Sequence, residues 1–235
     1  MKIELLYPGV ANLYGDLMNV RYMAQCTGAE VVETGIKDTP HFTYEDIDLV
    51  YMGCTTEKGQ SLIRDAFRPY VDALDQRIDE GGVTLVTGNA LEIFGQRIDN
   101  EDGSSEEMLG LYNTYARRRM MNRYNSLYLG MLTDFEIIGF KSQFSHSYGE
   151  MPTPLFETIR GAGLNPDVTG EGIRINNFMA TYVEGPILII NPLFNKYVQK
   201  LMGIEVPVIA YEKAAMDVYK TRLAEFKEPT RGFIY

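Results

Sequence analysis

Residues 83–95 read VTLVTGNALEIFG, and this stretch decides the fold. Its first five residues, Val83 to Thr87, are uncharged and rich in β-branched side chains, which is typical of a strand buried on both faces. Gly88 and Asn89 then predict a tight turn, and residues 90–94 predict a short helix that ends at the next glycine. A strand, a turn and a helix in this order indicate the first half of a parallel βαβ unit.

The chain before this stretch repeats the alternation of strand and helix. Short apolar runs at residues 3–7, 30–34 and 48–52 predict three more strands. Apolar residues at helical spacing follow at 17–24 and at 62–78. Strands that alternate with helices indicate a parallel sheet with right-handed crossovers. We therefore expect an α/β fold, a three-layer α/β/α sandwich of the flavodoxin-like kind with a mostly parallel sheet.

The second half of the chain has a different pattern. Short apolar segments at residues 127–131 and 135–140 predict an antiparallel extension of the sheet, and residues 152–172 predict a loop region because Gly, Pro and Asp recur throughout. The remaining expected elements are strands at 178–183 and 187–190 and helices at 192–201 and 212–226. No repeat or linker interrupts the pattern, so we expect residues 1–235 to form a single domain.

The composition argues against several classes of protein. The 235 residues carry a formal net charge of −10, whereas a nucleic-acid binder needs an excess of Lys and Arg. Two cysteines and two histidines are too few for a disulfide framework or a histidine-rich metal site. No apolar run approaches the roughly 20 residues of a membrane span, and the N-terminus does not resemble a signal peptide. We expect a cytoplasmic protein that binds no nucleic acid, membrane, metal or cofactor.

The loops after three predicted strands are the expected place for chemistry. Ligands bind at the carboxyl ends of parallel strands, which here are followed by residues 8–19, 53–60 and 87–89. Residues 83–95 also have the frame of a nucleophile elbow, in which a strained turn exposes a Ser or Cys above the sheet. The turn residue is Gly88, which adopts such a backbone easily but has no side chain to attack a substrate.

Four segments resemble the class I (triad) glutamine amidotransferases. They read NLYGDLMN at residues 12–19, VYMGCTTEKGQ at 50–60, GNALEIFG at 88–95 and ATYVEGPIL at 180–188, in the order that the family has. The similarity is greatest to the branch that pairs with a Mur-ligase-like subunit to amidate peptidoglycan precursors, with the glutaminase domains of cobyric acid synthase as relatives. The resemblance implies a glutaminase fold and a synthetase partner, since this chain has no synthetase domain.

The departures from the family pattern fall on the residues that do the chemistry. The family reads approximately C-G-G-x-Q-x-L-G at the elbow and T-Y-x-H-G-P near the end of the domain. The resemblance therefore places the nucleophile position at Gly88, the base position at Glu184 and a substrate-holding glutamine position at Glu92. Glutamine hydrolysis by this route needs a thiolate and an imidazole that exchanges protons near neutral pH. No intact catalytic residue is expected.

A ligand site remains an expectation of the resemblance. It implies a small-molecule site lined by Gly53, Cys54, Thr55, Asn89, Glu92, Arg123 and Gln143. Arg123 follows an asparagine, as in an Asn-Arg pair of the family branch, and its planar guanidinium suits a carboxylate. Gln143 lies in GFKSQFS, residues 139–145, where the family reads G-F-E-N-H-G-G.

Several of these residues also have plain structural interpretations. Cys54 is either a relocated nucleophile or, as we favour, a small residue that fills a former glycine position. His146 lies in a polar segment and is expected to be solvated, as is the basic run at residues 117–119. Asp16 and Asn19 either brace the first helix or take part in function.

Three functions follow from these alternatives. The first is a non-hydrolysing binding or regulatory subunit that acts with a Mur-ligase-like or other synthetase partner. The second is an active enzyme with altered chemistry on an amide or ester, through Glu92, Glu184 or Cys54. The third is an interaction subunit whose pocket has collapsed. Glu92 and Glu184 in one closed pocket would favour the second function, and both in surface salt bridges would favour the first.

Overall fold

The computed structural model describes residues 1–234. Its centre is a six-stranded sheet in the order β13-β14-β4-β3-β1-β2, in which only β13 runs antiparallel. The strands, in chain order, are β1 (Lys2–Leu6), β2 (Glu30–Thr34), β3 (Leu49–Met52), β4 (Val83–Thr87), β13 (Ile173–Ile175) and β14 (Phe178–Thr181). The carboxyl ends of β1, β3, β4 and β14 therefore lie at one edge of this sheet, as the sequence predicts.

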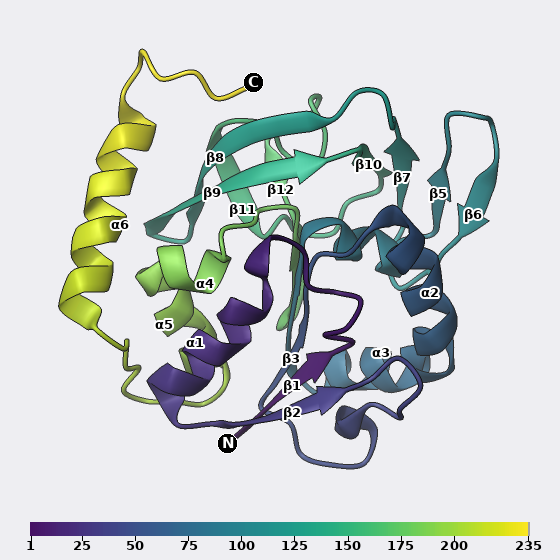
Figure 1. Ribbon diagram of the computed structural model, residues 1–235, viewed down its shortest axis with the longest axis horizontal. Helices are drawn as coiled ribbons and strands as arrows, with labels where there is room; N and C mark the ends of the chain where they lie inside the picture. The colour runs from purple at the N-terminus through teal and green to yellow at the C-terminus, as the bar shows by residue number, and fades with distance from the viewer. Residues whose placement is uncertain (235) are drawn as a thin grey trace.

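Helices cover both faces of the sheet (Figure 1). On one face of the sheet, Leu5 and Leu85 pack against the first helix and the helices after β14. On the other face, Leu6 and Val86 pack against the two helices before β4. Adjacent strand residues thus point to opposite layers, and the predicted three-layer α/β/α sandwich is confirmed. The helices are α1 (Leu17–Thr27), α4 (Ile187–Ile190) and α5 (Pro192–Leu201) on one face, and α2 (Glu57–Phe67) and α3 (Val71–Asp79) on the other. Short 3-10 helices are η1 (Leu13–Gly15), η2 (His41–Thr43), η3 (Arg68–Tyr70) and η4 (Gly88–Phe94).

The predicted antiparallel extension consists of two four-stranded sheets, which are antiparallel except for one parallel pair, Arg97–Asp99 beside Thr114–Arg118. They have the orders β10-β7-β5-β6 and β12-β11-β8-β9, and they lie beyond the carboxyl end of the central sheet (Figure 1). Their strands are β5 (Arg97–Asp99), β6 (Ser105–Glu107), β7 (Thr114–Arg118), β8 (Tyr124–Leu132), β9 (Phe135–Gln143), β10 (Ser145–Gly149), β11 (Phe156–Arg160) and β12 (Gly170–Glu171). The extension confirms the expectation from residues 127–140, but β11 and β12 fall in a region predicted as loop.

The predictions for residues 187–190 and for His146 are also wrong. Residues 187–190 form α4 and not a strand, because a short apolar run has no periodicity that separates a buried strand from a buried helical turn. The short helix predicted at residues 90–94 is present as the 3-10 helix η4, which begins two residues earlier, at Gly88. His146 lies in strand β10 and is half-buried, so it is not a solvated loop residue.

The C-terminal helix α6 (Glu212–Lys227) lies at one side of the molecule, at the left of Figure 1. It packs Tyr219 and Phe226 against β8 and β9. Arg160 of β11 holds the segment after the helix, since its guanidinium donates to the carbonyl oxygens of Phe226 at 2.7 Å, Glu228 at 2.9 Å and Arg231 at 2.7 Å. Among residues 1–234, no helix is both long enough and apolar enough to span a bilayer.

A buried ion pair joins β9 to β12. Lys141 is 1 % exposed and Glu171 is fully buried, and the Lys141 ammonium donates to the Glu171 carboxylate. The ammonium also donates to the carbonyl oxygens of Ala162 at 2.9 Å and Gly163 at 2.7 Å. Glu171 accepts from the Thr181 hydroxyl at 2.9 Å, so this pair connects the extension to the end of β14.

Removing one partner of this pair should destabilise the fold strongly. Lys141→Met leaves the Glu171 carboxylate buried without a counter-charge, which typically costs about 3–5 kcal/mol. Replacing both partners in Lys141→Met/Glu171→Leu should restore much of the loss. Urea unfolding measures the free energy of unfolding of both variants, and a single variant as stable as the wild type would contradict this account.

Candidate functional site

The backbone at the junction of β4 and η4 has the elbow geometry that the sequence predicts. Thr87 is extended, and Gly88 has φ +62°, a conformation that favours glycine. A Cβ atom on Gly88 would lie 2.5 Å from Cβ and 2.6 Å from Sγ of Cys54, and 2.6 Å from Oε1 of Glu184. The side chains of Cys54 and Glu184 therefore fill the space where a side chain at position 88 would begin.

Cys54 is fixed in the loop after β3. Its backbone N–H donates to the carboxylate of Asp16 at 2.8 Å, and its Sγ lies 3.3 Å from Oδ1 of Asn89. The same Asn89 oxygen accepts from the backbone N–H of Thr55 at 3.0 Å. Burial raises the pKa of the Cys54 thiol well above its ordinary value. The neutral thiol is therefore the stable form, and it is a weak nucleophile.

Glu184 follows β14 and is held by its backbone. Its N–H and C=O pair with Phe140 of β9, at 2.9 Å and 3.1 Å. The side chain is 2 % exposed, and its Oε2 has no hydrogen-bond partner among residues 1–234. Burial and the neighbouring Asp16 charge raise the pKa of the Glu184 carboxyl well above its ordinary value. A neutral carboxyl is therefore favoured beside Gly88.

Asp16 connects the three segments that meet at this point. Its carboxylate accepts from the Thr87 hydroxyl at the end of β4, from the Cys54 N–H, and from the Asn19 amide at 2.8 Å. The Tyr51 hydroxyl contacts both Asn19 and Thr87, at 2.7 Å and 2.8 Å. The Asp16 side chain makes no helix-capping hydrogen bond, so its structural role is to brace the site and not to cap α1.

Glu92 belongs to a separate buried network. Its carboxylate accepts from Gln60 Nε2 at 2.9 Å, from the Tyr182 hydroxyl at 2.8 Å and from the Ser145 hydroxyl. Arg118 of β7 donates to Oε1 of Gln60 at 2.7 Å, so a cation supports the network through one intermediate side chain. Burial raises the pKa of Glu92, while these hydrogen bonds oppose the shift.

The two glutamates therefore match neither arrangement anticipated from the sequence. Both are buried, and neither makes a salt bridge at the surface among residues 1–234. Glu92 accepts three hydrogen bonds from protein donors, whereas Glu184 packs against Gly88 and Cys54. The space beside the elbow is occupied by the chain's own side chains.

The other predicted ligand residues divide into two groups. Gly53 is needed for packing, because a Cβ there would lie 2.9 Å from the Ala11 carbonyl oxygen. Arg123 is exposed and donates to the Tyr14 hydroxyl at 3.1 Å, and Gln143 is buried with its Nε2 donating to the Ser145 carbonyl at 2.6 Å. Cys54 and Thr55 both contact Oδ1 of Asn89, the residue after Gly88, whereas Arg123 and Gln143 contact other residues.

Sequence reasoning missed the side chains that surround Glu92. Gln60 and Tyr182 lie within segments quoted for the resemblance, which is a signal that could have singled them out. Ser145 and Arg118 gave no such signal, because a serine and the middle arginine of a basic run are both typical of surface residues. In the structure Arg118 is 8 % exposed, so only Arg117 and Arg119 of that run are solvated as expected.

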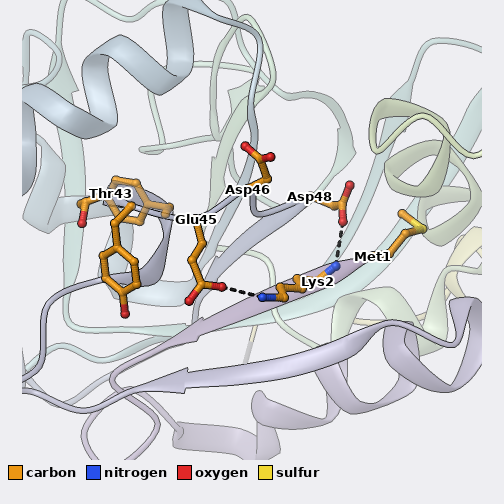
Figure 2. Close-up of a pocket in the computed structure, with 8 residues that line it drawn as sticks. Met1, Lys2, Thr43, Glu45, Asp46 and Asp48 are labelled. Carbon is orange, nitrogen blue, oxygen red and sulfur yellow. Dashed lines mark hydrogen bonds and ion pairs between the residues drawn. The ribbon is translucent and has the colours of Figure 1, made fainter.

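A large surface cavity lies at the opposite end of the sheet. It has a volume of about 750 Å³ and is lined by residues before and within β1 and by the segment 42–48, as Figure 2 shows. The Lys2 ammonium in this cavity is paired with the Glu45 carboxylate at 2.5 Å, and the Lys2 backbone N–H donates to Asp48 at 2.7 Å. Ligands of parallel sheets bind at the carboxyl ends of strands, so this cavity does not alter the location of the candidate site.

The packing beside Gly88 can be tested with a double-mutant cycle. Gly88→Ala should lower the free energy of unfolding by about 2 kcal/mol or more, from the positive φ and the clash with Cys54 together. Cys54→Gly in the same chain should remove the clash, so the double variant should lose less than the sum of the single losses. Strictly additive losses in urea unfolding would show that the two positions do not touch.

Glu184 should make stability depend on pH. Its folded-state pKa lies above its unfolded value, so the folded chain holds the proton more tightly and loses stability as pH rises through that interval. Glu184→Gln keeps the shape and cannot ionise. The free energy of unfolding of this variant relative to the wild type should therefore increase as pH rises above 4.5, the ordinary pKa of the carboxyl, as measured by urea unfolding at each pH. A difference that stays constant over this range would contradict the burial of an ionisable Glu184.

Comparisons with known proteins agree with the fold and the four segments. The profile of the CobB/CobQ-like glutamine amidotransferase domain matches residues 2–191. The lipid II isoglutaminyl synthase (glutamine-hydrolyzing) subunit GatD of Streptococcus pneumoniae is 26 % identical over 240 residues, which cover 96 % of this chain and 89 % of that protein. The subunit of the same name from Staphylococcus aureus is 26 % identical over 180 residues, or 75 % of this chain and 74 % of that protein.

A solved structure supports the fold independently of sequence. A glutamine amidotransferase from Thermotoga maritima superposes with a TM-score of 0.53 at 8 % identity, covering 97 % of this chain and 92 % of that one. At this identity the likeness concerns the fold alone. Because the family profile covers most of the chain, the protein belongs to the CobB/CobQ-like glutamine amidotransferase domain family.

Proposed function

We propose that this chain is a non-hydrolysing, glutamine amidotransferase-like subunit that acts with a Mur-ligase-like synthetase in the amidation of a peptidoglycan precursor in the cytoplasm. The two relatives named above are subunits of a lipid II isoglutaminyl synthase, and the pneumococcal one matches along almost its whole length. This similarity supports a synthetase as the partner and a peptidoglycan precursor as the substrate. The geometry at the elbow supports the absence of hydrolysis.

The observation that carries the proposal is the contact of Cys54 and Glu184 with Gly88. Glutamine hydrolysis by a thiol enzyme needs a thiolate at the elbow and a base that takes and returns its proton. Gly88 supplies no thiol, and the neighbouring side chains leave no room for one. Burial raises the pKa of the Glu184 carboxyl well above its ordinary value and so favours its neutral form, which cannot accept a proton.

The interior of the site also favours binding of a protein over binding of glutamine. Glu92 already accepts three hydrogen bonds from protein groups, so its carboxylate has little capacity left for a ligand. Cys54 and Glu184 occupy the volume beside the elbow. We therefore place the remaining function on the surface of the chain and in its contact with the synthetase.

A glutaminase assay tests the proposal directly. The purified chain, alone and mixed with its Mur-ligase-like partner, should release ammonia from glutamine at least about 10³-fold more slowly than an intact glutaminase, because both catalytic groups are absent. Robust ammonia release in either sample would overturn the proposal.

Restoring activity should require three substitutions together. Gly88→Cys/Glu184→His supplies both catalytic groups but leaves Cys54 in contact with position 88, so this double variant should stay inactive. Adding Cys54→Gly removes that contact, and the triple variant should release ammonia. Activity of the double variant equal to that of the triple variant would show that Cys54 does not block the elbow.

The position of Cys54 favours one alternative function. Its Sγ lies 2.6 Å from the point where a Cβ of residue 88 would be, so a thiol is present in the site although it comes from another loop. This arrangement supports an enzyme with altered chemistry on an amide or ester. Hydrolysis that is lost in Cys54→Ser and kept in Cys26→Ser, the matched change of the other buried cysteine, would establish this alternative in place of the proposed function.

A further inference from the structure

The connection between β7 and β8 exposes both arginine and methionine side chains on its outer side. Arg117, Arg119 and Arg123 are exposed, and between them Met120 is 44 % and Met121 is 88 % exposed. We call these five residues the Arg–Met surface. Figure 1 shows this connection at the upper edge of the molecule, on the side of the antiparallel sheets and away from α6.

The three arginines of this surface lack acidic partners. Within residues 1–234, no carboxylate lies within 4.0 Å of the guanidinium nitrogens of Arg117, Arg119 or Arg123. Arg117 instead lies over the rings of Tyr115 and Tyr148, at 5.3 Å and 4.7 Å from their centroids. The Glu101 carboxylate accepts from the Met120 N–H at 3.0 Å, so the surface carries three positive charges against one negative charge, which is a local reversal of sign on a chain of net charge −10. It makes an acidic binding partner electrostatically favourable.

The residue types indicate a protein partner. Arg and Met are enriched in the cores of protein–protein interfaces, and the flexible thioether of Met adapts to the surface opposite. A nucleic acid or an anionic membrane would be repelled by the remaining charge of the chain. Burial of Met121 against an apolar patch would also remove the most exposed methionine side chain of the described residues from water.

The Arg–Met surface is connected to the elbow through one loop. Arg123 donates to the Tyr14 hydroxyl at 3.1 Å and lies 4.6 Å from the Phe144 ring centroid. Tyr14 belongs to η1, whose Leu13 N–H donates to the Cys54 carbonyl at 3.0 Å. The side chain of Arg123 therefore connects this surface to the segment that hydrogen-bonds to Cys54.

We propose that the Arg–Met surface is the docking surface for an acidic, partly apolar face of the synthetase subunit. The inference rests on the proposed function for the identity of the partner, and on the charge and exposure of these five residues for the location. It goes beyond that function because it locates the contact on the β7–β8 connection and states that the partner's surface is acidic and partly apolar.

A binding experiment with charge-reversed variants tests this location. The reporter is the affinity of the full-length chain for the purified Mur-ligase-like subunit of the same organism, measured by calorimetry at low and at moderate salt. Arg119→Glu/Met121→Asp changes two exposed side chains that have no role in the elbow, and it should weaken binding about tenfold or more. Added salt should weaken wild-type binding and should affect this variant less.

A matched variant on another exposed face is the control. Lys220→Glu/Val218→Asp on α6 makes the same change of charge and polarity, since Val218 is 57 % exposed and Lys220 is exposed. It should bind like the wild type, and circular dichroism should show that both variants are folded. Equal affinity of both variants, with a wild type that binds, would overturn the docking surface and leave the proposed function intact.

Two other outcomes would also be decisive. A wild-type chain that does not bind the synthetase at all would overturn the proposed function, and the docking inference with it. Sedimentation with phosphatidylglycerol vesicles tests the competing membrane contact. Wild-type binding to vesicles that Arg119→Glu/Met121→Asp abolishes, while synthetase binding is unchanged, would assign the surface to a membrane.

Discussion

The contact of Cys54 and Glu184 with the backbone of Gly88 is the constraint on which the site depends. Three strand ends meet there, because Cys54 follows β3, Gly88 follows β4 and Glu184 follows β14. Asp16 fixes the first two of these ends through the Cys54 N–H and the Thr87 hydroxyl. The backbone at Gly88 therefore keeps the elbow geometry, but the side chains of Cys54 and Glu184 fill the space that a nucleophile would need.

The main features of the fold could be predicted from short patterns. The uncharged run at residues 83–87 and the glycine after it specified a buried parallel strand and a turn, and both are present as β4 and the start of η4. The order of strands and helices before residue 95 was enough for the three-layer arrangement, because parallel connections allow few alternatives. The prediction was wrong at residues 187–190, where four apolar residues fit either kind of buried element.

The interior of the site could not be predicted in the same way. The ends of the predicted strands pointed to the loops of Cys54 and Asn89, and the family resemblance pointed to Glu184. The distances of Cys54 and Glu184 from Gly88 depend on packing between distant strands. Arg118 looked like one member of a basic surface run, yet the alternation of β7 turns it inward to Gln60. Partners such as Lys141 and Glu171 are 30 residues apart and have no local signature.

The most direct measurement of the central claim is mass spectrometry after incubation with an electrophilic glutamine analogue that alkylates the catalytic thiol of glutaminases. The chain has only Cys26 and Cys54 as thiols, and both are buried. With no thiolate at the elbow and with Cys54 held as a neutral thiol, the account predicts an unmodified mass under conditions that fully label an intact glutaminase. Stoichiometric labelling of Cys54 that free glutamine prevents would contradict it, because it would show an open glutamine pocket with a reactive nucleophile.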